Sequence, residues 1–474
     1  MSLQFITGNS GNGKTKYLFN RIVKEAKANP RDNYLVIVPE QFTMQTQRQL
    51  VDLSENKAIM NIDVLSFKRL AYRVFDELGI TNLTVLEETG KNLVLRKLAA
   101  QEADKLGVIG RNLNRIGYIS EVKSLLSELV QYNISPEELG RYIASGRLSD
   151  ALSDKLKDVL VLYEAFEKFM QDKYITAEEI LNVLSNVAEE SAILRNSVIA
   201  FDEFTGFTPI QNQLIKKLFV ISKKIYVTLT IDCREDIFKS RGMQELFDMP
   251  KRTVKSLTEM AAFYGIEVEE PIILDKNYRL AENEELSFME QQLFRKRRCS
   301  FKKAPKHIHI DCLRDPKQEL TKIARRINEL VRNENLRYRD IAIVTGDVNI
   351  YAGYVREIFD KYNIPYFIDA TQEILFHPFI EFIRSIPDIA AQNFSADAVF
   401  RFLRCGFSEL LDSEIDVLEN YVLACGVRGK SAWDKKWVRL PKHKAGYDLE
   451  LLNQSREYIM ELLKPHRKNL NTAS

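Results

Sequence analysis

The sequence contains few cysteines and none of the patterns that would make them structural. Only five occur among 474 residues, and no two of them form a CxxC pair. This excludes a disulfide scaffold, a zinc ribbon and an iron–sulfur cradle built from these residues. No stretch reaches about 18 consecutive apolar residues, and the first residues lack a basic region followed by an apolar one. We therefore expect a soluble protein of a reducing compartment, the cytoplasm, with no membrane partner.

An excess of charge of one sign is also missing. Lysine and arginine number 68 against 66 aspartates and glutamates, which leaves a net charge of +2. A nucleic-acid interface would therefore have to come from local patches rather than from an overall field. Hydrophobic residues make up 45% of the chain and charged residues 28%, so the chain is not wholly disordered. At roughly 150 residues per domain, this length predicts about three domains.

Strands and helices are expected to alternate in the first 80 residues. Short apolar runs predict strands, and amphipathic stretches between them predict helices, which together indicate βαβ units and a parallel sheet. Leucines at helical spacing follow, and then strands return. The expected strands are 5–7, 34–38, 62–65, 198–201, 225–231 and 268–274, and the expected helices are 14–28, 45–53, 67–78 and 283–293.

A second α/β unit is expected further along the chain, with strands at 307–312, 341–344 and 366–368 and helices at 318–332 and 351–362. The chain then stops without a closing strand or cap, as expected at the edge of a fragment. The predicted organisation is a first α/β domain over 1–83 and 193–295, an all-helical insertion over 84–192, a basic linker over 296–303, a second α/β domain over 304–380, and a truncated helical insertion over 381–474.

One motif follows the first expected strand and opens the first expected helix, which is the context that a phosphate-binding loop requires. Glycines let backbone N–H groups surround phosphates, and the helix N-terminus adds partial positive charge. Lys14 is expected to reach the β- and γ-phosphates of ATP, and the Thr15 hydroxyl to bind Mg²⁺. The alternative is a chance glycine turn. The residues that match GxxxxGK[ST] are Gly8, Asn9, Ser10, Gly11, Asn12, Gly13, Lys14 and Thr15.

Two further segments carry candidate catalytic residues. An apolar strand ends in Asp202 and Glu203. In P-loop enzymes such an aspartate lies against Mg²⁺ and the following glutamate acts on the attacking water as a general base. Arg279 follows the strand at 268–274 and could neutralise charge that develops on a γ-phosphate. The alternatives are a strand that merely ends at acids and an arginine in solvent.

In this order, these motifs resemble the superfamily 1 helicase motor and, more closely, the B subunit of the AddAB-type bacterial helicase–nuclease. That resemblance implies two P-loop helicase-like (RecA-like) parallel-sheet domains with all-helical insertions. It also implies one half of a heterodimer, an ATP-dependent helicase and exodeoxyribonuclease whose A subunit is the partner in double-strand break repair by homologous recombination. Scanning of single-stranded DNA for the hotspot Chi is part of the same expectation. The nuclease domain and its iron–sulfur cluster are expected only outside this chain. The phrases that carry the resemblance lie at 36–41, 64–71, 201–209, 319–366 and 418–429.

The resemblance also implies a path for single-stranded DNA across the loops that follow the second and third strands. Aromatic rings stack on bases, while lysine and arginine hold phosphates. The alternative is that Phe42 and Phe67 are core residues at helix starts. The basic segments 295–303 and 428–444, the latter with Trp433 and Trp437, are further candidates, with a solvated linker as the alternative. The residues expected on the path are Phe42, Ser66, Phe67, Lys68 and Arg69.

Some features of the motor family are missing. Seven residues before the phosphate loop leave no room for an adenine-reading glutamine, and Phe204 and Thr205 stand where a glutamine is usual. Residues 230–233 replace the usual Gly-Asp-x-x-Gln, and a second arginine motif is not visible. We therefore expect ATP binding with slow or absent hydrolysis. Two alternatives remain open, a small-molecule P-loop phosphotransferase and a nucleotide-independent DNA-binding scaffold.

Overall fold

The computed structural model describes residues 1–81, 84–108, 110, 116–146, 148–170, 174–295, 299–370, 374–441 and 447–464. Contacts between Cα atoms divide the chain into two units, residues 1–309 and residues 310–474, and each is considered by itself. Of the predicted basic segments, 296–298 and 442–446 lie outside the described residues. Among the helices of the described residues, none is long and apolar enough to cross a membrane.

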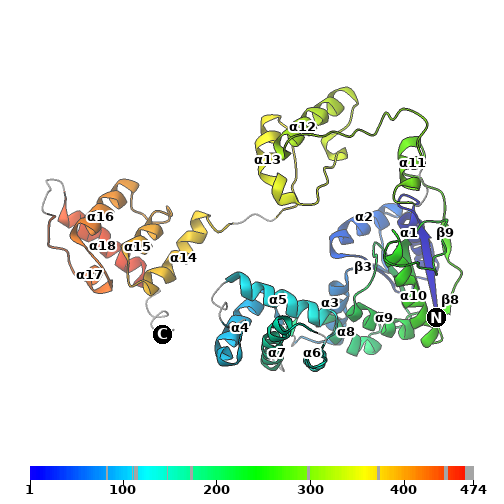
Figure 1. The fold of residues 1–474 in the computed structure, drawn as a ribbon, viewed down its shortest axis with the longest axis horizontal. Helices are drawn as coiled ribbons and strands as arrows, with labels where there is room; N and C mark the ends of the chain where they lie inside the picture. The colour runs from blue at the N-terminus through cyan, green and yellow to red at the C-terminus, as the bar shows by residue number, and fades with distance from the viewer. Residues whose placement is uncertain are drawn as a thin grey trace. The chain divides into compact units, whose positions relative to one another are not determined.

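A parallel sheet forms the centre of the first unit, as the alternating pattern predicts (Figure 1). Its strand order is β3-β2-β6-β7-β1-β8, and β9 also pairs with β1. The strand predicted at 268–274 is divided in two, because Pro271 cannot donate a ladder hydrogen bond. The strands are β1 (Ser2–Gly8), β2 (Tyr34–Ile37), β3 (Ile62–Leu65), β6 (Val198–Phe201), β7 (Lys224–Thr230), β8 (Glu267–Val268) and β9 (Ile272–Leu274).

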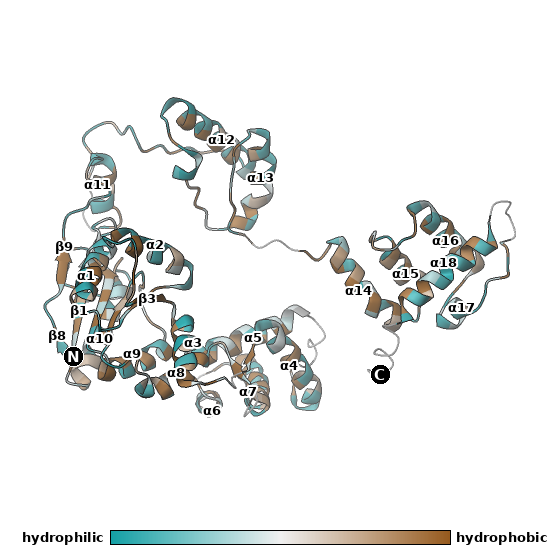
Figure 2. Cartoon of the chain, turned by 180° about the vertical axis from the view of Figure 1, so that it is seen from behind, coloured by the Kyte–Doolittle hydropathy of each residue, from teal (hydrophilic) through white to brown (hydrophobic). Residues whose placement is uncertain are grey.

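Helices cover both faces of this sheet, which a parallel sheet requires. Successive strand residues point to opposite faces, so Phe5 joins one hydrophobic core and Ile6 the other. The strands are mostly hydrophobic, and the helices carry a hydrophobic and a hydrophilic side (Figure 2). One face is covered by α1 (Lys14–Ala28) and α2 (Thr43–Leu53), and the other by α3 (Phe67–Leu78), α8 (Ile180–Val187), α9 (Pro209–Ile221) and α10 (Asp248–Phe263).

Residues 84–192, predicted as an all-helical insertion, contain helices and also two features that the sequence did not indicate. The ends of this segment are tied by a small parallel sheet of β4 (Val85–Leu86) and β5 (Ile175–Thr176), which leucine spacing did not indicate. Helix α8 packs into the core of the main sheet through Ile180 and Leu184, rather than with the other helices of the insertion. Those others enclose a core of their own and are α4 (Glu88–Gln101), α5 (Ile116–Gln131), α6 (Pro136–Ala144) and α7 (Asp150–Met170).

The strands predicted at 307–312, 341–344 and 366–368 are wrong, because no described residue between 304 and 370 lies in a strand. The two predicted helices form as α12 (Pro316–Asn333) and α13 (Val348–Lys361). Parallel strands are stable when both of their faces are buried. Helices α12 and α13 enclose a small core, and the apolar residues that would face a second layer are exposed: Ile310 at 94%, Val344 at 92% and Phe367 at 90%.

The last described part of the chain is helical and has its own core. Trp433 is fully buried and Trp437 is 7% exposed, and the Trp437 indole N–H donates to the carbonyl of Ala432 at 3.0 Å. The two indoles therefore build the core and are not available as surface rings for stacking. The helices are α14 (Pro378–Ala391), α15 (Ala396–Leu403), α16 (Asp412–Cys425), α17 (Lys430–Asp434) and α18 (Leu449–Leu462).

Candidate functional site

The phosphate loop joins β1 to α1 at the carboxyl edge of the sheet, where ligands bind in open α/β folds. Two of its glycines are required by close neighbours. A Cβ atom on Gly8 would lie 2.5 Å from the carbonyl oxygen of Leu274. Gly11 has a φ of +89°, and a Cβ atom there would lie 2.7 Å from Oδ1 of Asn277. The loop therefore keeps its glycines partly because β9 and the segment after it press against it.

Hydrogen bonds fasten the loop to that segment. The Asn12 side-chain amide donates to the carbonyl of Leu274 at 2.5 Å, and the Asn277 amide donates to the carbonyl of Ser10 at 2.9 Å. The backbone N–H of Tyr278 donates to the carbonyl of Gly11 at 3.0 Å. The sequence placed Arg279 near this loop, and these bonds bring the whole stretch from Leu274 to Arg279 against it.

The Lys14 ammonium lies inside the loop. Its Nζ donates to the carbonyls of Gly8 and Asn9, both at 3.1 Å. Burial lowers the pKa of Lys14, while the carboxylates of Glu203 and Asp202 act in the opposite direction. A cation held among carbonyls at a helix N-terminus can turn toward an incoming phosphate group.

Asp202 and Thr15 converge beside this lysine. The Thr15 hydroxyl is 3.3 Å from Oδ1 of Asp202 and 3.4 Å from Oε1 of Glu203, and the Thr228 hydroxyl also donates to Oδ1 of Asp202. Asp202 is 1% exposed, and among the described residues its Oδ2 atom has no hydrogen-bond partner. Buried carboxylate oxygens without partners are costly. A hydroxyl beside a free carboxylate oxygen is a donor set that suits Mg²⁺.

The charges of Asp202 and Glu203, which lie next to each other, agree with a cation site. Burial raises the pKa of Asp202, and the neighbouring Glu203 raises it further. Glu203 also has a φ of +64°, a left-handed backbone that costs a residue other than glycine about 1 kcal/mol or more. Such strain is found most often at functional sites, and it turns the exposed Glu203 side chain toward the Thr15 hydroxyl.

Most of the predicted nucleotide residues line one cavity of about 780 Å³: Ser10, Gly11, Gly13, Lys14, Thr15, Asp202, Glu203 and Arg279. Gly8, Asn9 and Asn12 are not among its lining residues. Arg279 is exposed at its rim, and its Nη1 atom lies 3.5 Å from the Ser10 hydroxyl. Sequence reasoning missed Tyr278, whose ring lies 3.6 Å from the place of a Cβ atom on Gly13. The available signal was an aromatic residue directly before the predicted Arg279. Phe204, Thr205 and Thr230, which were noted in the sequence only as departures from the motor family, also line the cavity. The other lining residues that the sequence did not single out are Lys16, Phe19, Gln45, Thr46, Gln49, Asp52, Leu53 and Thr228.

Glu40, which was not predicted as a site residue, joins the two loops expected on the DNA path. The Ser66 hydroxyl accepts from the backbone N–H of Arg69 at 3.3 Å, which caps α3, and it donates to the carboxylate of Glu40. The Arg69 side chain donates to the same carboxylate at 3.1 Å. The bond from Ser66, followed by that from Arg69, lowers the pKa of Glu40. Lys68 beside them is exposed.

The two aromatic residues of the expected path differ in exposure. Phe67 is 7% exposed, and its ring contacts Phe201, Phe204 and Phe207 with centroids 5.6–6.3 Å apart. The structure therefore places Phe67 in the core, the alternative left open by the sequence. Phe42 is half-buried at the end of the 3₁₀ turn η1 (Glu40–Phe42), and its side chain lines the cavity described above.

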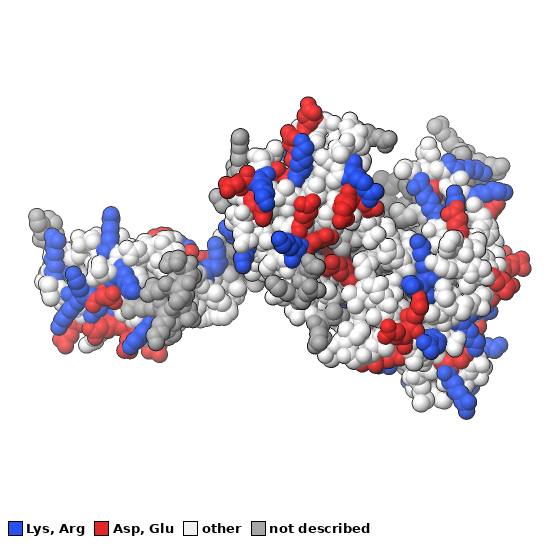
Figure 3. Space-filling view, turned by 90° about the horizontal axis from the view of Figure 1, so that it is seen from below, with Lys and Arg blue, Asp and Glu red and all other residues white. Residues whose placement is uncertain are grey.

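Charge is spread over the face of the molecule drawn in Figure 3, where lysine and arginine alternate with aspartate and glutamate. This fits the net charge of +2. On that face no large patch of one sign is visible, so a polyanion would be held there by individual contacts. In the described part of the chain, no three His, Cys, Asp or Glu side chains are grouped to hold a metal ion.

Residues 5–290 match the family model described as "ADDB, N-terminal". The chain belongs to this family. It is 38% identical over its whole length to a protein of Lachnoclostridium phytofermentans, 34% over 99% of its length to one of Clostridium tetani, and 33% over 98% to one of Clostridioides difficile. Each of the three is named as the B subunit of an ATP-dependent helicase/deoxyribonuclease, which confirms the resemblance seen in the sequence. The chain covers 42%, 42% and 40% of these relatives.

Proposed function

We propose that this chain is the N-terminal, helicase-like part of the B subunit of an ATP-dependent DNA helicase–nuclease, and that it binds ATP with Mg²⁺. One observation carries the nucleotide assignment. The buried Oδ2 atom of Asp202 has no partner in the described part of the chain, and it lies at the carboxyl edge of the sheet beside Thr15. A Mg²⁺ ion that also binds phosphate would satisfy it.

Each residue of the site has a role in this proposal. Lys14 leaves the carbonyls of Gly8 and Asn9 and binds the β- and γ-phosphates. Thr15 and Asp202 hold Mg²⁺, which when bound neutralises phosphate charge. Glu203 orients water as a general base. The Arg279 guanidinium, at the cavity rim, approaches the γ-phosphate.

Single-stranded DNA is proposed to cross the loops at 39–43 and 66–69. Lys68 and Arg69 are exposed and can hold phosphates, and Phe42 offers a partly exposed ring. Phe67 does not contact the DNA in this proposal. Its buried ring supports the start of α3, where Lys68 and Arg69 lie. The bridge from Ser66 to Glu40 keeps the two loops together.

The wider role rests on the family. We propose that the complete protein works with its A subunit on DNA ends, in double-strand break repair by homologous recombination, and that it scans single strands for Chi. The names of the relatives support the enzyme class. We also keep a second helicase-like domain over 304–380 as a proposal, supported by α12 and α13 at their expected positions.

Binding of Mg·ATP and of a single-stranded oligonucleotide, measured singly and together on the purified chain, tests the proposal. We expect both to bind, with oligonucleotide preferred over duplex. Nucleotide binding without DNA binding would favour a small-molecule phosphotransferase. DNA binding without nucleotide binding would favour a scaffold with a vestigial loop.

A further inference from the structure

The side chain of Asn9 connects the phosphate loop to two other segments. Asn9 is 5% exposed. Its Nδ2 donates to Oε1 of Glu290 on α11 (Glu284–Gln292) at 2.7 Å, and its Oδ1 accepts from the backbone N–H of Cys233 at 2.9 Å. A phosphate loop binds its ligand with backbone N–H groups. The buried amide of Asn9 is therefore directed away from the ligand and toward these two segments.

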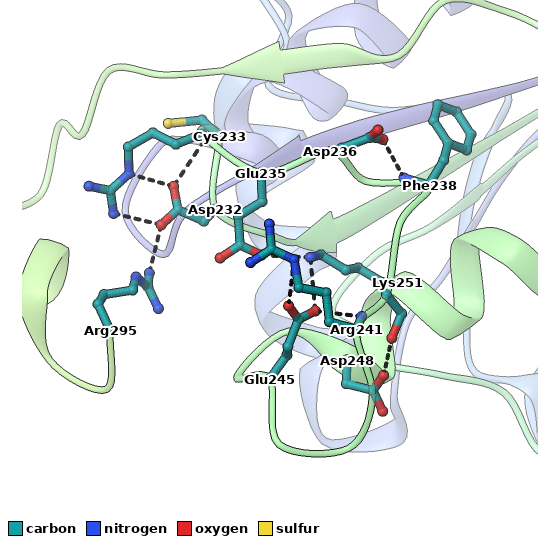
Figure 4. A network of polar contacts seen from close by, with 12 residues as sticks. Asp232, Cys233, Glu235, Asp236, Phe238, Arg241, Glu245, Asp248, Lys251 and Arg295 are labelled. Carbon is teal, nitrogen blue, oxygen red and sulfur yellow. Dashed lines mark hydrogen bonds and ion pairs between the residues drawn. The ribbon is translucent and has the colours of Figure 1, made fainter. Parts of the chain in front are cut away.

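The same two segments are joined a second time through Asp232 (Figure 4). The Arg295 guanidinium donates to Oδ2 of Asp232 at 2.8 Å. Arg234 donates to the same oxygen at 2.6 Å and to the carbonyl of Gln291 at 3.2 Å. Asp232 is 1% exposed, and although burial acts to raise its pKa, the bonds from Arg234 and the charge of Arg295 lower the pKa to about 2. The carboxylate therefore stays charged at neutral pH, and both guanidinium groups can donate to it.

The contacts therefore form a closed ring. It runs from the phosphate loop at Asn9 to the turn at 232–234, from there to Arg295, back along α11, and through Glu290 to Asn9 again. Every member lies in the first unit. The bond between Glu290 and Asn9 joins residues 281 positions apart in the sequence, and it is charge-assisted, so it is stronger than a bond between neutral groups.

Nucleotide binding acts on this ring at Asn9. One of the two carbonyls that accept from Lys14 belongs to Asn9 itself, at 3.1 Å. That carbonyl also accepts from the backbone N–H of Asn12 at 3.2 Å. When Lys14 turns to a phosphate group, the carbonyls of Gly8 and Asn9 each lose the hydrogen bond from its Nζ, and Asn9 is the one of the two whose side chain holds Glu290.

We propose that Glu290 is a positioning residue of the nucleotide site, which acts through Asn9 to keep the phosphate loop in its binding conformation. Because binding free energies are reciprocal, nucleotide at the loop changes the stability of α11 by the same coupling. The inference rests on the proposed function, since it requires that the loop binds nucleotide.

The test uses three variants of the whole chain. Glu290→Ala removes the acceptor of the Asn9 amide, and Glu290→Gln keeps a carbonyl oxygen in its place. Glu284→Ala is the matched control, because Glu284 lies on the same helix and pairs only with the exposed Lys303 among the described contacts. The affinity for Mg·ATP is measured by calorimetry, and amide hydrogen exchange over 284–295 is measured with and without Mg·ATP.

We expect Mg·ATP to slow exchange over 284–295 in the unsubstituted chain. Glu290→Ala should weaken ATP binding about tenfold and abolish that slowing, whereas Glu290→Gln should retain most of both and Glu284→Ala should change neither. Asn9→Ala should weaken ATP binding and abolish the slowing of exchange to the same extent as Glu290→Ala. The double variant of Asn9 and Glu290 should lose no more ATP affinity than either single variant, because the effects of coupled residues are not additive. If Glu290→Ala does not fold, the inference is tested by the other two variants: Asn9→Ala should lose ATP affinity and the slowing of exchange, and Glu290→Gln should retain most of both.

Two results would overturn the inference while leaving the proposed function intact. In one, the unsubstituted chain binds ATP with no change in exchange over 284–295. In the other, folded Glu290→Ala binds ATP as tightly as the unsubstituted chain. If the unsubstituted chain binds no nucleotide, the proposed function itself fails, and the inference fails with it.

Discussion

At the scale of single residues, Asp202 combines features that a purely structural residue would avoid. It is 1% exposed, burial raises its pKa, and one of its carboxylate oxygens is without a partner among the described residues. Buried polar groups are nearly always paired. Residues that violate this rule at a site are commonly retained because function requires them, at a cost in stability.

Asp202→Asn is therefore expected to raise the melting temperature in the absence of Mg²⁺, since it removes a buried charge and keeps the Oδ1 acceptor for Thr15 and Thr228. It should also abolish the dependence of ATP affinity on Mg²⁺. Thermal unfolding and calorimetric titration of both proteins measure these effects. A lower melting temperature with unchanged dependence on Mg²⁺ would contradict the assignment.

The pH dependence of that stability difference has a definite sign. Protonation favours the folded state, because the pKa of Asp202 is raised in it above the ordinary value of 3.8. The advantage of Asp202→Asn should therefore be full above the raised pKa. It should shrink as the pH falls through that pKa toward 3.8. An advantage that grows on acidification would argue against a buried, raised carboxyl group.

Phe67 and Phe42 give a second prediction at this scale. Phe67→Ala should cost about 3–5 kcal/mol in the free energy of unfolding, because it leaves a cavity among three other phenylalanines. Phe42→Ala should cost less stability and weaken oligonucleotide binding by roughly 1–3 kcal/mol if its ring stacks on one base. Denaturant unfolding and oligonucleotide titration of each variant separate the two effects. Unchanged affinity per folded Phe42→Ala molecule would exclude that ring from the DNA path.

At the scale of elements, local signals were sufficient for several elements of the first unit. Helix α3 begins at the predicted residue because Ser66 caps it, and it ends before Gly79, which adopts a left-handed backbone. Strands β3 and β6 coincide with their apolar runs. Contacts made between distant parts of the chain could not be predicted in this way. The bond from Asn9 to Glu290 and the bridge through Glu40 depend on how the elements pack.

The second unit illustrates the opposite case. The apolar runs at 341–344 and 366–368 have the composition of parallel strands, but a strand forms only when both of its faces can be covered. Residues such as Val344, 92% exposed, have no covering layer in the described part of the chain. The pattern of apolar residues indicates which secondary structure a segment favours. It does not indicate whether other elements are available to cover the faces of a strand.

Amide hydrogen exchange provides the corresponding prediction. Backbone amides of β6 (Val198–Phe201), which pair on both sides with β2 and β7, should exchange about a hundredfold or more slowly than those of 342–344, for which no sheet pairing is described. Exchange followed by mass spectrometry measures both in one experiment. Equal protection would show that 342–344 lies in a sheet in solution, as the sequence predicts.

At the scale of the whole molecule, hydrolysis should be slow or absent in this chain alone. Phe204 and Thr205 replace the usual glutamine, and Arg279 is the single arginine found at the cavity rim among the described residues. Each missing group that stabilises transition-state charge is worth several kcal/mol. Phosphate release with and without single-stranded DNA measures the rate. Rapid, DNA-stimulated turnover would place the chain among active motors.

The central claim is that the loop from Gly8 to Thr15 binds ATP, and it is tested most directly by calorimetric titration of Mg·ATP into the unsubstituted chain and into Lys14→Ala. The lysine contributes charge rather than packing, so the two proteins should unfold within about 2 °C of each other, as is usual for changes outside the core. We predict saturable binding by the unsubstituted chain and none by Lys14→Ala at the same concentrations. Equal affinity in the two proteins, with matched unfolding, would contradict the account.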